Sequence, residues 1–257
     1  MTADLMVFAT HGLFGVSCIT ALTVQSTLGV RRVEPVSSQT VGETLACLHE
    51  DVPPAGIKIG MIATSDNVQA VCEYLEVLRG TPEGRSVPVV LDPVLQATSG
   101  ARLLDKLGAS VLGDRLLGLV DWVTPNVPEL AALIGREVGG PDDLPEACRA
   151  LQGRSGGRLG VFAKGGHLEK PDDFLLMLRG EEFWITGERV DTRSTHGTGC
   201  ALSSAFLSRL VLGHDAGAAA KLAKHYVEEA LRKAHPLGGG AGPLNHLWPI
   251  ANLQDAE

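Results

Sequence analysis

Short segments that are apolar on both faces constrain the fold of this chain more than any other feature. Residues 87–91 and 159–163 are of this kind, and segments of helical length alternate with the predicted strands along much of the chain. A strand without a polar face belongs to a parallel sheet that helices cover on both sides. The sequence therefore predicts a three-layer αβα sandwich with a mainly parallel central sheet.

The remaining pattern supports the same alternation. We expect helices over residues 1–11, 41–48, 67–78, 103–119 with an interruption near Gly108, 127–134, 144–151, 201–212 and 216–234. We expect strands over residues 16–24, 57–61, 87–91, 122–124 and 159–163, and a hairpin of residues 174–178 and 182–186. The glycine-rich segment 238–243 is predicted to be a loop. No linker or repeat divides residues 1–257, so a single domain is expected.

Charge and cysteine content exclude several classes of protein. The net charge of −8 without a basic cluster argues against nucleic-acid binding. The five cysteines are widely spaced and form no C-x-x-C pair, so neither a zinc site nor a disulfide framework is indicated. No apolar run has the length of a membrane span and no signal peptide is recognisable, which predicts a cytoplasmic protein without a membrane partner.

A glycine-rich turn at residues 194–200 precedes the apolar helix over residues 201–212. Gly197 and Gly199, with Thr198 between them, allow an anion to approach the free N–H groups of a helix start. Cys200 lies in the first turn, where the helix field is expected to lower the pKa of its thiol. Cys200 is then a candidate base or nucleophile, and the alternative is a buried structural cysteine.

Polar side chains follow several of the predicted strands. In the order of the chain they are Gln25, Met61 with its thioether, Asp92, Asn126 and Lys164. Ligands of α/β sheets bind outside the carboxyl ends of the strands. We therefore expect these five positions to meet at one rim of the sheet.

The rim has the residue types that phosphoryl transfer requires. No P-loop is present, and Leu202 occupies the third glycine position of a possible G-x-G-x-x-G. Glu129 offers a carboxylate, although it also suits the first turn of a helix, and Asp92 before Pro93 also suits a turn. Lys164 is best explained as a phosphate contact. The sequence leaves the roles of His196 and His167 open.

Several motifs resemble those of the hydroxymethylpyrimidine and phosphomethylpyrimidine kinases, which are thiamine-biosynthesis members of the ribokinase-like superfamily. The main ones are residues 123–129 (VTPNVPE), 164–167 (KGGH) and 195–200 (THGTGC). Further similar segments are residues 19–27, 57–61, 91–94 and 242–246. The similarity extends over almost the whole chain, with the motifs in the same order.

This resemblance implies an ATP- and Mg²⁺-dependent kinase that phosphorylates 4-amino-5-hydroxymethyl-2-methylpyrimidine and its monophosphate, and it suggests a homodimer. The implied pyrimidine pocket consists of Gln25, Thr23, Met61 and Val94. Asn126, Lys164 and Thr195 are implied for ATP and its phosphates, and Glu129 and Asp92 for Mg²⁺. The amides of residues 197–200 are implied as the anion hole, and Cys200 as the catalytic base.

Compared with this family, the sequence begins at the helix that follows the family's first strand and glycine-rich substrate loop. We therefore expect a fold without that first strand, and a ligand-binding remnant without turnover is one alternative function. A pyridoxal or pyridoxine kinase is another, because that ring also carries a hydroxymethyl group beside polar substituents. A third alternative, acyl transfer by Cys200 with His196, leaves Asn126, Glu129 and Lys164 unexplained.

Overall fold

A six-stranded sheet forms the centre of the molecule, seen in a computed structural model that describes residues 1–96, 100, 103–166 and 168–250. The strand order is β3 (Ile57–Ile59), β4 (Val89–Leu91), β5 (Trp122–Val123), β6 (Gly160–Ala163), β7 (Asp173–Leu176) and β8 (Glu182–Ile185). The first four strands are parallel, whereas β7 runs antiparallel to both of its neighbours. The predicted three-layer α/β fold with a mainly parallel sheet is confirmed.

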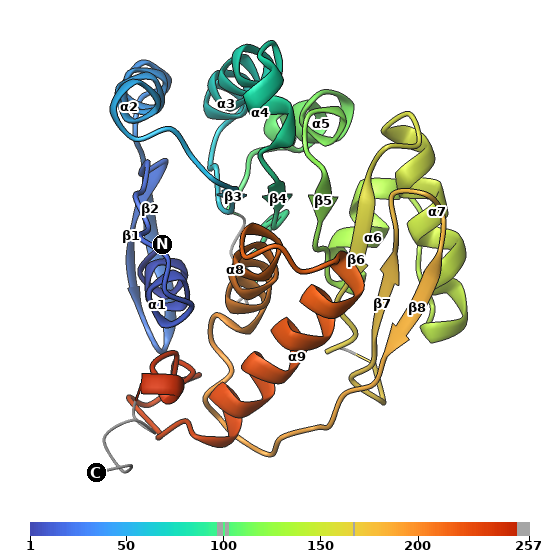
Figure 1. Cartoon of the computed structure of the whole chain (residues 1–257). Coiled ribbons are helices and arrows are strands. Elements are labelled where there is room, and N and C mark those ends of the chain that lie inside the picture. Colours follow the sequence, from blue (N-terminus) through green and yellow to red (C-terminus); the bar gives the residue numbers. More distant parts are fainter. Residues whose placement is uncertain (97–99, 101–102, 167, 251–257) are drawn as a thin grey trace.

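Helices cover both faces of the sheet (Figure 1). On one face lie α3 (Ser65–Arg79), α5 (Lys106–Asp114), α6 (Val127–Ile134) and α7 (Leu144–Arg154), with α2 (Ser38–Asp51) packed on α3. On the other lie α1 (Thr2–Thr10), α8 (Thr198–Val211) and α9 (Ala216–Arg232). Short elements connect them: α4 (Pro82–Ser86), η1 (Leu116–Gly118) and η2 (Pro141–Asp143).

Strand β4 shows why its sequence has no polar face. Val89 and Leu91 belong to the core under α3, α5, α6 and α7, while Val90 belongs to the core under α1, α8 and α9. All three residues are fully buried. Successive side chains of a strand point to opposite faces, so a strand between two helical layers needs apolar residues at every position.

The segment predicted as a strand over residues 16–24 differs from the structure. The strand is β1 (Ala21–Ser26), which pairs with β2 (Gly29–Pro35) in a two-stranded antiparallel hairpin outside the central sheet. Leu22 and Val24 alternate with Thr23 and Gln25, and all four are exposed. This alternation indicates a hairpin rather than a buried parallel strand, so the expectation that Gln25 follows a strand of the central sheet is wrong.

Buried Asn67, at the start of α3, fixes the base of this hairpin. Its side-chain amide donates hydrogen bonds to the carbonyl oxygens of Thr20 and Val36, each at 3.1 Å, and to that of Ile62 at 3.3 Å. Thr20 and Val36 directly flank the two hairpin strands. A single side chain therefore joins both ends of the hairpin to the body of the molecule.

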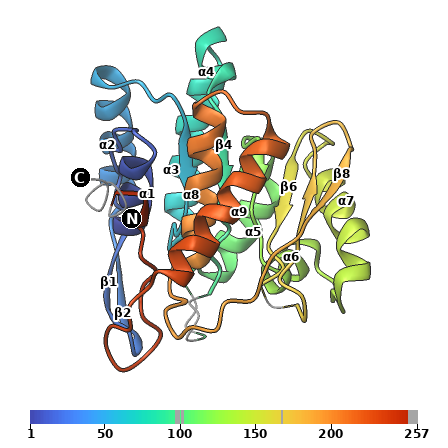
Figure 2. The same ribbon diagram turned by 60° about the horizontal axis from the view of Figure 1, so that its bottom comes forward.

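The tip of the hairpin contacts the predicted glycine-rich loop near the C-terminus (Figure 2). A Cβ atom on Gly240 would collide with the carbonyl oxygen of Thr27, so a side chain at this position would displace the tip. Elsewhere, the helix predicted over residues 103–119 is interrupted at Arg115, between α5 and η1, rather than near Gly108. Within the described residues, no helix is long and apolar enough to cross a membrane.

Candidate active site

The carboxyl ends of the parallel strands form one rim, where four of the predicted positions meet. Asp92 directly follows β4, Lys164 directly follows β6, and Asn126 forms a parallel bridge with Lys164. Met61 follows β3 by two residues and lines the cavity beside the rim. The structure thus brings together residues from strands that are far apart in the sequence.

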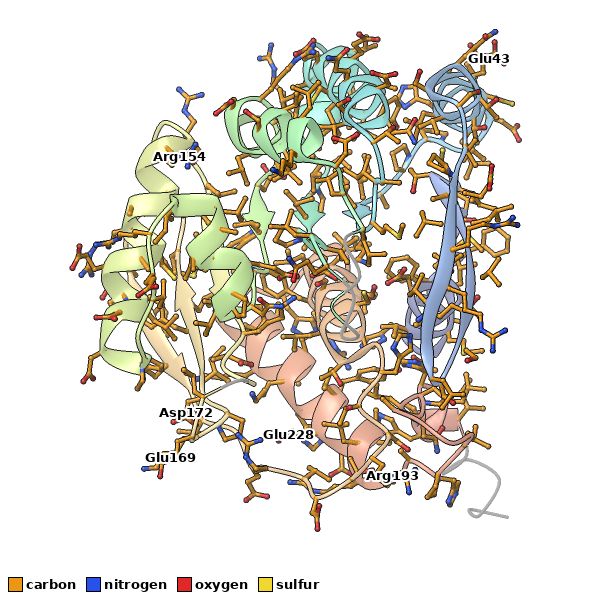
Figure 3. All side chains as sticks on the ribbon, turned by 180° about the vertical axis from the view of Figure 1, so that it is seen from behind. Glu43, Arg154, Glu169, Asp172, Arg193 and Glu228 are labelled. Carbon is orange, nitrogen blue, oxygen red and sulfur yellow. The ribbon has the colours of Figure 1, made fainter. Side chains whose placement is uncertain are left out.

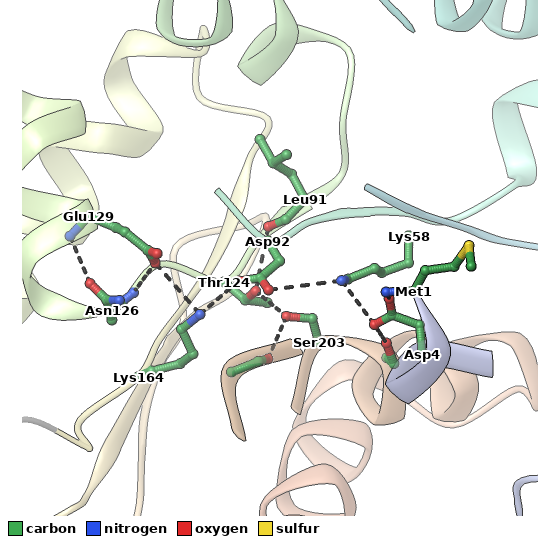
Figure 4. A network of polar contacts seen from close by, with 12 residues as sticks. Met1, Asp4, Lys58, Leu91, Asp92, Thr124, Asn126, Glu129, Lys164 and Ser203 are labelled. Carbon is green, nitrogen blue, oxygen red and sulfur yellow. Dashed lines mark hydrogen bonds and ion pairs between the residues drawn. The ribbon is translucent and has the colours of Figure 1, made fainter. Parts of the chain in front are cut away.

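Lys164 is the centre of a buried group of charges at this rim (Figure 4). Its Nζ lies 2.8 Å from Oδ1 of Asp92 and 3.6 Å from Oε2 of Glu129. The side chain of Lys164 is 11% exposed, and those of Asp92 and Glu129 are 2% and 9% exposed. Most other charged side chains are directed to solvent, as Figure 3 shows for Glu43, Arg154, Glu169 and Arg193.

Glu129 serves the start of its own helix as well as this charged group. The side chain of Asn126 accepts a hydrogen bond from the Glu129 amide, and Glu129 accepts one from the Asn126 amide, both at 2.8 Å. This reciprocal capping box fixes the first turn of α6. One carboxylate therefore caps α6 and faces Lys164, so the structural role of Glu129 leaves its predicted chemical role open.

A second buried lysine, to which we assigned no role from the sequence, adjoins the same carboxylate. Lys58 Nζ lies 3.0 Å from Oδ1 of Asp4 in α1 and 3.9 Å from Oδ2 of Asp92. Ser204 of α8 donates a further hydrogen bond to Asp4 at 2.7 Å. A lysine at the middle of an apolar strand is the sequence signal that identifies this site, because a buried lysine requires partners.

Burial and the two lysines shift the pKa values of the carboxylates in opposite directions. Burial alone would raise the pKa of Asp92, but attraction to Lys164 and Lys58 holds it below its usual value. Burial raises the pKa of Glu129, which is paired with Lys164 and also experiences the negative charge of Asp92. Of the two carboxylates, Asp92 is therefore the one held more firmly as an anion.

The N-terminus of α8 faces this group and has the predicted form. Its N-cap, Gly197, has φ of +86° and provides no side-chain cap for the helix amides. An ideal Cβ on Gly199 would lie 3.0 Å from Nζ of Lys164, so the missing side chain leaves room for the ammonium group. Ser203 donates to the Gly199 carbonyl at 3.0 Å and hydrogen-bonds to Thr124 at 2.6 Å, which joins this turn to β5.

Cys200 lies where the sequence predicts, but the expected effect on its thiol is wrong. The thiol donates a hydrogen bond to Asp92 and lies near Lys58. Burial, together with the negative charge of Asp92, raises its pKa to about 12, although Lys58 acts in the opposite direction. The helix field is too weak to reverse these effects, because a dipole contribution is worth only about 0.3–1 kcal/mol at a typical helix end.

The predicted pyrimidine-binding residues lie around one cavity of about 1720 Å³, whose lining also includes the rim. Thr23, Gln25, Met61, Val94 and Thr195 all contribute to the lining. Drug-sized ligands occupy roughly 300–1000 Å³, so this cavity has space for two small molecules. Strand β1 thus supplies Gln25 and Thr23 from the hairpin, rather than from the central sheet.

His196 is in contact with Gln25, and both residues line this cavity. Their Nε2 atoms are 3.2 Å apart, and both side chains are exposed. This contact joins the hairpin to the loop before α8. His167, the other histidine considered above, lies outside the described residues.

The residues at the rim fit a divalent cation that is bound together with a phosphate ligand. The described part of the chain contains no group of three or more His, Cys, Asp or Glu side chains arranged to hold a metal ion. Mg²⁺ commonly binds to one or two protein carboxylates and completes its shell with water and substrate phosphates. The ammonium group of Lys164, which lies between Asp92 and Glu129, shows that this position accepts a cation.

Comparison with known proteins agrees with this geometry. A family model described as phosphomethylpyrimidine kinase matches residues 1–245. The hydroxymethylpyrimidine/phosphomethylpyrimidine kinase of Haemophilus influenzae is 37% identical over 258 residues, which cover 98% of this chain and 92% of that protein.

Two solved structures have the same fold. The phosphomethylpyrimidine kinase of Clostridium difficile is 31% identical with a TM-score of 0.76, and the match covers 89% of this chain and 91% of that one. The pyridoxal kinase of Bacillus subtilis, solved as an ADP complex, is 26% identical with a TM-score of 0.83. This match covers 96% of this chain and 91% of that one. The sequence identity is higher with the phosphomethylpyrimidine kinase, whereas the TM-score is higher with the pyridoxal kinase.

Proposed function

The chain belongs to the phosphomethylpyrimidine kinase family, and we propose that it phosphorylates 4-amino-5-hydroxymethyl-2-methylpyrimidine and then the resulting monophosphate, with ATP as the phosphoryl donor. The observation that supports this function most is the position of Lys164. It lies between two buried carboxylates on one side and the amide-lined start of α8 on the other. Phosphoryl transfer requires this combination of a cation, metal-binding carboxylates and an anion hole.

The start of α8 stabilises the charge of the phosphoryl group as it is transferred. The first N–H groups of a helix have no partner within the helix, and the first turn of α8 lies against Lys164 at Gly199. Gly197 and Gly199 keep the approach free of side chains. Donors that are already oriented need no rearrangement during the reaction, which makes their contribution large.

Cys200 is the proposed base for the hydroxymethyl group of the acceptor. Its thiol lies in the first turn of α8, next to the proposed path of the phosphoryl group, and is hydrogen-bonded to Asp92. A thiolate whose conjugate acid has a pKa of about 12 is a strong base but a scarce one at neutral pH. Proton removal by Cys200 should therefore depend steeply on pH.

Asp92 and Glu129 are the proposed ligands of Mg²⁺, with Asn126 beside them. A bound Mg²⁺ would neutralise charge on the phosphate oxygens of the nucleotide. Lys164 would then bind the same phosphates as an additional positive charge. Thr195, on the loop that leads into α8, completes the proposed phosphate contacts.

The acceptor is proposed to bind under the hairpin. Gln25 would hydrogen-bond to the ring, while Thr23, Met61 and Val94 would surround it. Homodimer formation is proposed from the family alone, and light scattering after size-exclusion chromatography tests it. Pyridoxal is the second candidate acceptor, because the structural similarity to the B. subtilis pyridoxal kinase is high.

A direct comparison of acceptors tests this function. The purified protein is assayed with ATP, Mg²⁺ and either the pyrimidine alcohol or pyridoxal, and kcat/KM is compared. We expect a higher value for the pyrimidine, and Gln25→Ala should raise the KM for the pyrimidine far more than the KM for ATP. A strong preference for pyridoxal would assign the protein to the second function, and equal effects on both KM values would place Gln25 outside the acceptor site.

A further inference from the structure

Lys164 occupies the place that the proposed function assigns to a metal ion. Its Nζ lies within 4 Å of both Asp92 and Glu129, at 2.8 and 3.6 Å. The other buried lysine at the rim, Lys58, contacts Asp92 only at 3.9 Å and pairs mainly with Asp4 at 3.0 Å. Lys164 is therefore the lysine that bridges the two proposed metal ligands.

An ammonium group and a divalent cation cannot both occupy the position between Asp92 and Glu129 without a large cost. Asp92 and Glu129 are almost completely buried, so the solvent does little to screen an ammonium group from a divalent cation beside it. Binding of the metal ion to both carboxylates requires Lys164 to move away from them. The direction in which it can move is given by Gly199, because the ammonium group already lies against the first turn of α8.

We propose that Lys164 and the divalent cation compete for Asp92 and Glu129, so that the protein binds the free metal ion weakly and binds it well only when nucleotide phosphates attract Lys164. The proposal rests on the assignment of the rim as the phosphate and metal site of the proposed kinase. Lys164 thereby couples the two binding events. The metal ion and the nucleotide should each increase the affinity for the other.

The consequence for catalysis is an ordered exchange of partners within the rim. When phosphate oxygens approach the start of α8, Lys164 exchanges its carboxylate partners for phosphate partners, and the carboxylates become free to bind the metal ion. Lys58 stays beside Asp92, because Asp4 holds it from α1. Asp92 therefore keeps one positive neighbour throughout.

Mn²⁺ binding, followed by electron paramagnetic resonance on the full-length chain, tests the competition without any enzymatic turnover. For the wild-type protein we expect weak binding of Mn²⁺ alone and about 10- to 100-fold tighter binding in the presence of ADP, which is the usual range for coupled sites. Lys164→Met should bind Mn²⁺ alone about tenfold or more tightly than the wild-type protein, and ADP should add less. Lys164→Arg, which keeps the charge, should bind free Mn²⁺ as weakly as the wild-type protein.

Lys224 provides a matched control. Its Nζ lies 2.9 Å from Oδ2 of Asp173, and the exposures of the two side chains, 12% and 3%, nearly equal the 11% and 2% of Lys164 and Asp92. Lys224→Met therefore removes an equally buried charge whose ion pair is with Asp173 rather than with Asp92 or Glu129, and it should leave Mn²⁺ binding unchanged. The thermal midpoint gives a second readout, because Mn²⁺ alone should raise it for Lys164→Met and not for the wild-type protein.

Either of two results would overturn the competition. One is wild-type affinity for Mn²⁺ that is the same with and without ADP, a measurement that needs no variant to fold. The other is a folded Lys164→Met protein that binds Mn²⁺ no better than the wild-type protein. Should the Mn²⁺ pattern hold while neither alcohol is phosphorylated, the competition would stand and the proposed function would fall.

Discussion

Substitution of Cys200 tests the chemistry of the proposed base. A thiol with a pKa of about 12 is ionised in only about one molecule in ten thousand at pH 8. If the thiolate removes the proton from the acceptor alcohol, the single-turnover rate should rise nearly tenfold for each pH unit between about pH 7 and pH 9. Cys200→Ala should lower this rate by about two to four orders of magnitude.

Two further variants separate ionisation from the shape of the site. Cys200→Ser keeps a hydrogen-bond donor for Asp92 but hardly ionises, so it should be nearly as slow as Cys200→Ala. Cys200→Asp introduces a group that is ionised at much lower pH than the thiol, so its rate should depend much less on pH over the same range. Single-turnover measurements with saturating ATP and pyrimidine isolate the chemical step from product release.

The reasoning would be refuted if Cys200→Ala retained a rate within tenfold of the wild-type rate, or if the wild-type rate were independent of pH. Alkylation gives an independent check, because iodoacetamide reacts with the thiolate. Cys200 should react slowly at pH 8 and faster as the pH rises. Cys47, which is exposed, should react earlier under the same conditions, and peptide mass spectrometry distinguishes the two sites.

The remaining predictions concern the hairpin and the pH dependence of stability. Asn67→Leu removes three hydrogen bonds at the base of the hairpin and should lower the free energy of unfolding by about 2–3 kcal/mol, measured with urea, while it raises the KM for the pyrimidine more than that for ATP. Gly240→Ala forces a Cβ atom against the Thr27 carbonyl and should also raise the KM for the pyrimidine. Gly239→Ala has room for its Cβ atom and should leave this KM unchanged. If the two variants have the same KM for the pyrimidine, the loop does not hold the hairpin tip. Burial lowers the pKa of His11 and of His246, so the unfolded chain takes up protons first as the pH falls, and the unfolding free energy should decrease from about pH 7 toward pH 5. A variant that combines His11→Gln with His246→Gln should lose less unfolding free energy over this pH range. If it loses as much as the wild-type protein, other groups cause the pH dependence.

The sequence was sufficient to predict the layers of the fold and much of the rim. Strand segments that are apolar at every position, as in β4 and β6, can be stable only between two helical layers. Once the sheet is parallel, the residues after these strands must meet at one edge, and this places Asp92 near Lys164 without any further information. The capping box of Asn126 and Glu129 is equally local, since its two members are three residues apart.

Two features of the site depend on contacts that sequence patterns do not reveal. The run over residues 16–24 contains enough apolar residues to resemble a buried strand, although Leu22 and Val24 alternate with polar residues and lie in an antiparallel hairpin. Lys58 acquires its role from Asp4, which is 54 positions away and belongs to a helix on one face of the sheet. The pairing of Lys58 with Asp4 cannot be recognised until α1 is placed beside β3.

The thiol of Cys200 shows how such long-range contacts change a chemical inference. At the start of a helix, local reasoning predicts a lowered pKa, because the dipole favours the anion. The fold adds Asp92 and removes solvent, and each change favours the neutral thiol. Lys58 limits this effect, and it can do so only because Asp4 fixes it at the rim. The pKa of the proposed base is therefore set by residues from α1, β3 and the end of β4 as well as by the helix on which it lies, and a variant at Asp4 should change the pH dependence of the reaction.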